Sequence, residues 1–230
     1  MIKLVYSPSW FFGKDLLIDI ISLVVLLLIS SFAVRCYRLN KNRNYLNFSL
    51  SFSLLALSFL SKILTNFTIY YTSIMHHDFG PFILTYQALL SSKILILIGF
   101  IGYFFFGMAG LLSLLLVYKK DTSRAMVFLL VYLVLIATYL SMIDYFFFHL
   151  TSLLLLVFIT STYLKNYEKN MSASSGLLAY AFLTITFSQL IFTFIGFCTL
   201  CYVFAEGVQL AGYLMLFGVF FRIIKNGKKK

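Results

Sequence analysis

Glu206 and Gln209 stand inside a long apolar stretch near the end of the chain, "FCTLCYVFAEGVQLAGYLMLFG" at 197–218. Tyr202, Glu206, Gln209 and Tyr213 recur at i, i+4, i+7 and i+11, which is one stripe of a helix. A charged side chain that faces lipid at mid-depth costs about 2.5–3.5 kcal/mol, so this stripe should face other helices. Polar groups in such a place either form internal ion pairs or line a pocket or path.

Polar residues of other apolar stretches fall at the same depth. Asp19, His149 and Glu206 each lie 16 residues before the basic residue at the inner end of their own stretch. At 1.5 Å per residue this places them roughly 24 Å above the inner surface. Gln189 and Lys62 count to a similar height. We therefore expect an inward-facing polar layer that opens toward the outside. The residues assigned to this layer are Asp19, Lys62, Lys93, Asp144, His149, Gln189, Glu206 and Gln209.

Two interpretations of this layer remain open. In the first, Glu206 pairs with Lys62 or Lys93 and the layer only holds the helices together. Asp15 and Asp19 would then be acids at the positive N-terminal end of the first helix, with Asp15 as a capping residue. In the second, the layer binds a ligand, because charge inside a membrane is functional by default.

The composition predicts that the helices carrying these residues are membrane spans. The 230 residues are 62% hydrophobic and 11% charged, whereas a soluble domain averages about a quarter charged residues. One small globule cannot bury so much apolar surface. The net charge of +11 comes from residues between and after the apolar stretches, so it indicates membrane orientation rather than nucleic-acid binding.

Seven stretches are long enough to cross a membrane, and together they predict one all-α transmembrane domain over 1–230. A span needs about 20 apolar residues. Every second connection is basic, and the positive-inside rule then puts the N-terminus outside and the C-terminus inside a cell membrane. The start of the chain has too long an apolar run for a cleaved signal peptide. The predicted spans are 15–34, 46–71, 92–118, 125–144, 145–164, 175–197 and 198–221.

Glycines predict close helix packing in the third span. Gly99, Gly102, Gly107 and Gly110 fall within one helical arc, where a neighbouring helix can approach. We expect this span to be the central helix of the bundle.

Two further groups could carry chemistry near the outer face. Cys198 and Cys201 form a C-x-x-C pair, which could be a disulfide or a redox couple working with quinone. The third cysteine, Cys36, is predicted on the inner side, so a second relay pair is missing.

"MHHD" at 75–78 offers His76, His77 and Asp78 as weak metal ligands, but its spacing matches no specific metal motif. We predict neither a metal site nor an enzyme.

"SPSWFFGKD" before the first span and "AEGVQLAGYLML" in the last resemble uncharacterised archaeal-type seven-span membrane proteins, whose topology is similar to that of rhodopsins and receptors. The resemblance implies a fold and no activity. A rhodopsin needs a lysine in the middle of its last helix, where this chain has Gln209, so covalent retinal is excluded. No cofactor other than bound lipid is expected.

Three functions are compatible with these features. The first is a non-enzymatic receptor-like or accessory subunit that binds a small ligand at the polar layer and a membrane or cytoplasmic protein partner through its basic inner loops. The second is a small-solute or ion transporter that uses Glu206, Lys62 and Gln209. The third is a thiol or quinone oxidoreductase at Cys198 and Cys201.

Overall fold

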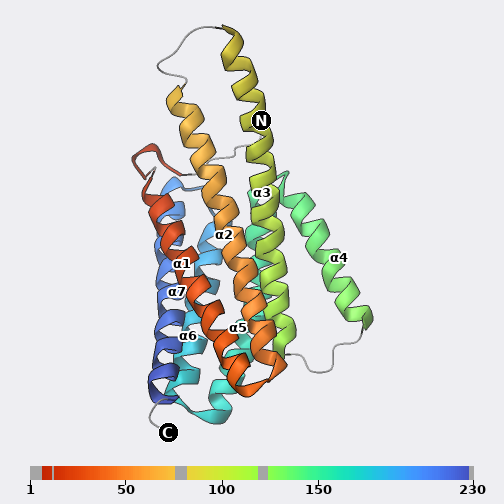
Figure 1. Cartoon of the computed structure of the whole chain (residues 1–230), viewed down its shortest axis with the longest axis vertical. Helices are drawn as coiled ribbons and strands as arrows, with labels where there is room; N and C mark the ends of the chain where they lie inside the picture. Colours follow the sequence, from red (N-terminus) through yellow and green to blue (C-terminus); the bar gives the residue numbers. More distant parts are fainter. Residues whose placement is uncertain (1–6, 12, 76–81, 119–123, 228–230) are drawn as a thin grey trace.

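The computed structural model of the chain is all-helical, in agreement with the predicted fold class (Figure 1). It describes residues 7–11, 13–75, 82–118 and 124–227. A single 3₁₀ turn, η1, precedes seven α-helices in the described residues. The elements are η1 (Ser9–Phe11), α1 (Lys14–Asn40), α2 (Arg43–Met75), α3 (Phe82–Tyr118), α4 (Arg124–Ser141), α5 (Tyr145–Asn170), α6 (Ala173–Thr193) and α7 (Thr199–Gly227).

Six of the described helices are long and apolar enough to cross a membrane, which makes the chain a multi-pass membrane protein. The helix that falls short is α4, whose apolar part is Val127–Ser141. Those 15 residues rise about 22 Å, against a hydrocarbon core about 30 Å thick. A seventh crossing and the orientation of the bundle in the membrane stay predictions.

The six long helices form a closed ring. Along this ring α1 contacts α2, α2 contacts α3, α3 contacts α5, α5 contacts α6, α6 contacts α7 and α7 contacts α1. The short α4 lies outside, against α3 and α5, and Figure 1 shows it leaning away from the bundle. The expectation that the third span is central is wrong, because α3 is one member of the ring and exposes Ile94, Leu95 and Ile98.

The ring is built from two copies of one three-helix unit. Buried positions of α1 have buried counterparts 130 residues later, in α5. Ser22 corresponds to Ser152, Ile29 to Ile159 and Ser30 to Thr160. Both helices also end alike, at Lys41 with φ 49° and at Met171 with φ 47°. The pattern indicates a parallel duplication, α1–α3 and α5–α7, joined through α4.

Glycine contacts in the third helix of each unit support the duplication. A Cβ on Gly110 of α3 would lie 3.1 Å from the backbone nitrogen of Leu55, and a Cβ on Gly212 of α7 would lie 3.2 Å from that of Ile185. Leu55 and Ile185 are themselves 130 residues apart. The predicted close approach along the glycines of α3 is confirmed, and the neighbouring helix is α2.

Candidate functional site

A buried lysine joins three helices on the inside of the ring. Lys62 Nζ of α2 donates to Asp19 Oδ1 of α1 at 2.8 Å and to Glu206 Oε1 of α7 at 2.5 Å. Lys62 is 6% exposed, Asp19 0% and Glu206 1%. Since α1 contacts both α2 and α7, its second turn is the place where the three side chains meet. We call Asp19, Lys62 and Glu206 the triad.

Aromatic rings surround the lysine of the triad. The ring centroids of Phe59 and Tyr202 both lie 5.9 Å from Lys62 Nζ, a distance at which a ring face attracts a cation. Phe59 also packs edge to face on Tyr213. The ammonium is therefore held by two carboxylates and two rings, with water excluded from all of them.

The charges and hydrogen bonds of the triad do not balance. Two carboxylates face a single ammonium, so the fully ionised triad carries one net negative charge. The second oxygen of each acid, Asp19 Oδ2 and Glu206 Oε2, is buried and has no hydrogen-bond partner among the described residues. A buried polar atom without a partner costs about 1–3 kcal/mol, and a charged one costs more. One additional proton on either acid would remove the charge and supply a donor.

The second three-helix unit holds a neutral pair in a matching place. His149 Nδ1 of α5 lies 2.8 Å from Gln189 Oε1 of α6, and because an amide oxygen only accepts, Nδ1 donates this bond. His149 is 1% exposed, and none of the described residues forms a hydrogen bond with its Nε2. The imidazole stacks on Phe192 with centroids 4.6 Å apart. This geometry leaves a basic nitrogen pointing at no partner inside the ring.

The duplication explains how the two polar groups are related. Asp19 and His149 occupy equivalent positions, 130 residues apart, and Lys62 is equivalent to Phe192 in the same way. The rings of Phe192 and Tyr202 are 6.0 Å apart, so the histidine pair and the triad are linked through two aromatic side chains. At these two positions the first unit has a carboxylate and an ammonium group, whereas the second unit has an imidazole and a phenyl ring.

Most of the predicted polar layer lies inside the ring. Gln209 is buried and its Nε2 donates to the hydroxyl of Tyr213 at 3.3 Å, one turn beyond Glu206. Asp144 is not in the layer: it is exposed and accepts from the backbone nitrogen of Phe146 at the start of α5. The side chain of Lys93 lies outside the described residues.

Asp15 serves the start of α1, as the capping interpretation expects. Its Oδ1 accepts from the backbone nitrogens of Gly13 and Leu16. Asp19, one turn later, takes the other role and pairs with Lys62 rather than with the helix end. Acids only four residues apart thus have different functions in the fold.

Cys198 and Cys201 lie close together with free thiols. Cys198 precedes α7 and Cys201 is on its first turn, and both are partly exposed. A hydrogen bond from the Cys201 thiol lowers the pKa of Cys198. Such a pair could be oxidised to a disulfide, and its redox role stays a prediction. The candidate metal ligands His76, His77 and Asp78 lie outside the described residues, and within the described part of the chain no three His, Cys, Asp or Glu residues lie together so as to hold a metal.

No family model, curated protein or solved structure matches this chain. The function must therefore be argued from the site.

The sequence analysis placed Tyr202 and Tyr213 on the polar stripe, but it missed Phe59 and Phe192 and the relation between the two polar groups. Phe59 and Phe192 look like ordinary core residues in a chain with 27 phenylalanines. The signal that could have placed them is the parallel repeat, visible as "SLVVLLLIS" at 22–30 and "SLLLLVFIT" at 152–160. A search for inverted repeats cannot find it, because both copies run in the same direction.

Proposed function

We propose that this protein is a proton-linked membrane carrier of a small solute, and that the triad is the site where the proton binds. The observation that carries the proposal is the presence of two buried carboxylates around one buried lysine. Nothing in this mechanism requires an enzyme activity or a cofactor.

The proton follows from charge. A net charge in a water-free interior costs several kcal/mol, and buried groups neutralise rather than accept that cost. When two carboxylates share a site, their repulsion favours a proton on one of them. The neutral triad thus holds Lys62 as ammonium, one acid as carboxylate and the other as carboxylic acid. Loss of the proton restores one negative charge and weakens the packing around it.

The position of the triad between the two units favours transport. Asp19 and Lys62 belong to the first unit and Glu206 to the second. In many secondary carriers, repeats related by an axis along the membrane normal hold the substrate and coupling ions near the midplane at their interface. Movement of one unit against the other would pull Glu206 away from Lys62, so proton binding and unit movement would be coupled.

Proton movement in liposomes tests the carrier proposal. The purified protein would be reconstituted with a pH-sensitive dye inside, and monosaccharides, amino acids and small amines would be added outside one at a time. We expect at least one solute to change the internal pH in the wild-type and none to do so in Glu206→Gln, which cannot exchange the proton. Glu168→Gln is the matched control, because Glu168 is an exposed glutamate at the inner end of α5.

Two outcomes would contradict the carrier. The first is a solute that moves protons equally well in Glu206→Gln and in the wild-type. The second is a correctly folded wild-type protein that moves protons with no member of the panel.

A receptor-like protein is the second candidate, and the continuity of the helices favours it. Carriers often bind substrate at interrupted helices, whereas α1, α2, α5 and α7 run unbroken past the triad and the histidine pair. Protonation or ligand binding would then shift the two units and change a partner rather than move a solute. The liposome assay separates the candidates, because a receptor shows no solute-dependent proton flux.

A further inference from the structure

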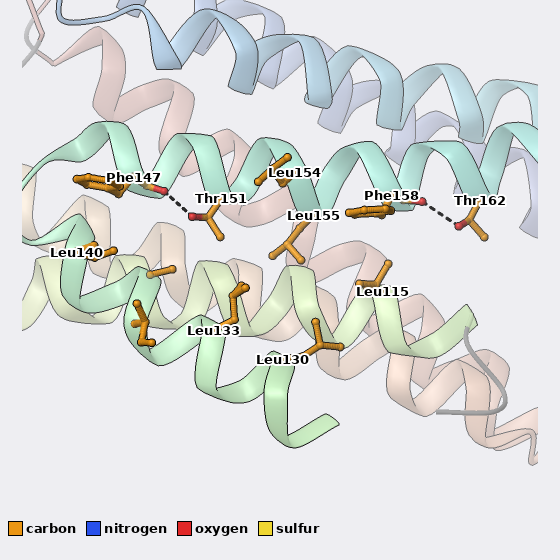
Figure 2. A pocket seen from close by; sticks show the side chains of 12 residues that line it. Leu115, Leu130, Leu133, Leu140, Phe147, Thr151, Leu154, Leu155, Phe158 and Thr162 are labelled. Carbon is orange, nitrogen blue, oxygen red and sulfur yellow. Dashed lines mark hydrogen bonds between the residues drawn. The ribbon is translucent and has the colours of Figure 1, made fainter. Parts of the chain in front are cut away.

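A second site lies on the outside of the ring, where α4 leans away from it. A groove of about 610 Å³ runs between α4 and α5, with α3 as its floor (Figure 2). Leu130, Leu133 and Leu140 form the α4 wall, and Phe147, Thr151, Leu154, Phe158 and Thr162 line the α5 side. From Phe147 to Thr162 the groove follows about 22 Å of helix. The hydrocarbon core is about 30 Å thick, so each leaflet contributes about 15 Å, and the groove is longer than that.

The groove is a wedge that opens at one end. Its closed end is the turn between Ser141 and Tyr145, where α4 passes directly into α5. From this turn α4 diverges from the bundle, so the separation is widest beside the start of α4 and the C-terminal half of α5 (Figure 1). In the predicted orientation the wide end faces the inner leaflet. A lipid of that leaflet can enter the wedge with its chain pointing toward the turn.

The walls offer an occupant few hydrogen-bonding groups and no free side-chain donor. Ten of the twelve lining residues are apolar, and the other two are Thr151 and Thr162. Thr151 donates to the carbonyl of Phe147 at 2.7 Å and Thr162 to that of Phe158 at 2.9 Å, so both hydroxyl hydrogens are used within α5 and each hydroxyl oxygen can only accept (Figure 2). A hydrocarbon chain satisfies such a surface, whereas a sugar, a peptide backbone or any polar solute would lose hydrogen bonds there.

Positive charge marks the open end. Lys165 follows Phe158 and Thr162 at i+7 and i+3 on the same stripe of α5, and it is exposed. It lies about 4.5 Å along the helix beyond Thr162. A phosphate at this level would have a cation beside it while its chain lies in the groove.

We propose that the groove between α4 and α5 binds one acyl chain of an anionic phospholipid from the inner leaflet, with the lipid phosphate at Lys165. Both parts of the lipid are required: the apolar wedge selects the chain and the basic end selects the headgroup. The bound chain fills the space that separates α4 from α5 and holds α4 at its present angle. This site is independent of the triad and of the proposed carrier function.

Native mass spectrometry of the full chain in mild detergent tests the site with defined probes. Phosphatidylglycerol and phosphatidylcholine of the same acyl chains would be added at equal concentration. One retained phosphatidylglycerol per chain is expected, preferred about fivefold over phosphatidylcholine, the contribution of about one basic residue near an anionic surface. Leu154→Trp fills the groove and should abolish retention. Val157→Trp is the matched control, because Val157 is exposed on the same helix but does not line the groove.

Lys165→Gln separates the two parts of the proposal. It should keep one retained lipid per chain but remove the preference for phosphatidylglycerol. Retention that survives Leu154→Trp would overturn the groove as the binding site. An equal affinity for both lipids in the wild-type would overturn the anionic headgroup, and a dimer that forms only when the groove is unfilled would show that a second copy of the chain is the occupant instead.

Discussion

Lys62→Met should be among the most destabilising single substitutions in this protein, lowering the free energy of unfolding by about 3–5 kcal/mol. Methionine fits the space of the lysine stem but leaves Asp19 and Glu206 buried without a counter-charge. Their repulsion and missing hydrogen bonds then act together on three helices, α1, α2 and α7. Unfolding by denaturing detergent, followed by helix content, measures the loss.

A combined variant distinguishes charge from packing. Lys62→Met together with Asp19→Asn and Glu206→Gln removes all three charges at similar volume, and it should recover most of the stability. Lys169→Met is the matched control, because Lys169 is exposed and its loss should change stability by less than about 0.5 kcal/mol. A Lys62→Met protein as stable as the control would show that the triad is not an essential electrostatic unit.

Gly212→Val should cost about 1–3 kcal/mol through overpacking between α6 and α7. A Cβ at this position would lie 2.5 Å from Ile185 Cγ1, 3.2 Å from the Ile185 backbone nitrogen and 3.3 Å from the Ala181 carbonyl oxygen. The isoleucine can change rotamer, but the backbone atoms can move only if the two helices separate. Thermal unfolding in detergent reports the effect.

Gly218→Val is the control for this substitution, because Gly218 is on the same helix and nothing lies within 4 Å of its added Cβ. Both variants carry the same change in helix propensity, so the difference between them isolates the helix contact. Because the duplication places Gly110 against Leu55 as it places Gly212 against Ile185, Gly110→Val should lose stability to a similar degree. Equal stability of Gly212→Val and Gly218→Val would contradict the close contact.

The sequence predicts the buried partners well where charge restricts the choices. A glutamate and a lysine buried at the same depth of one bundle must either pair or face water, and Glu206 of α7 and Lys62 of α2 are found paired beside α1, which contacts both helices. His149 and Gln189 count to this depth too, and they are hydrogen-bonded to each other. Depth follows directly from the fixed rise of a helix, which is why counting residues places them.

The side-by-side arrangement of the helices is much harder to predict from one sequence. The apolar stretch at 125–144 qualifies as a span by composition, yet α4 ends at Ser141 and lies outside the ring. Its side chains are apolar on every face, so no polar stripe indicates which way it should turn or how closely it packs. The groove beside α4 is hard to predict for the same reason. Apolar residues are found both facing lipid and in the protein interior, so only the angle of α4 shows which of its residues line a groove.

The pairing of Asp19 with Lys62 depends on α1 lying beside α2 in the ring. Asp19 could be explained as an acid near a helix N-terminus, since it is only four residues after Asp15. The structure gives the two acids different partners: the Asp15 carboxylate accepts from the backbone at the helix start, whereas the Asp19 carboxylate accepts from Lys62 of α2. No spacing rule within α1 alone makes that distinction.

The central claim is that the triad holds one proton more than three independent ionised groups would hold. Infrared spectroscopy of the protein in lipid at neutral pH tests it directly, through the carbonyl stretching band of a protonated carboxylic acid. We predict such a band in the wild-type, its loss in both Asp19→Asn and Glu206→Gln, and no change in Glu168→Gln. The absence of the band from the wild-type at neutral pH would show both acids to be ionised around Lys62, and would contradict the account.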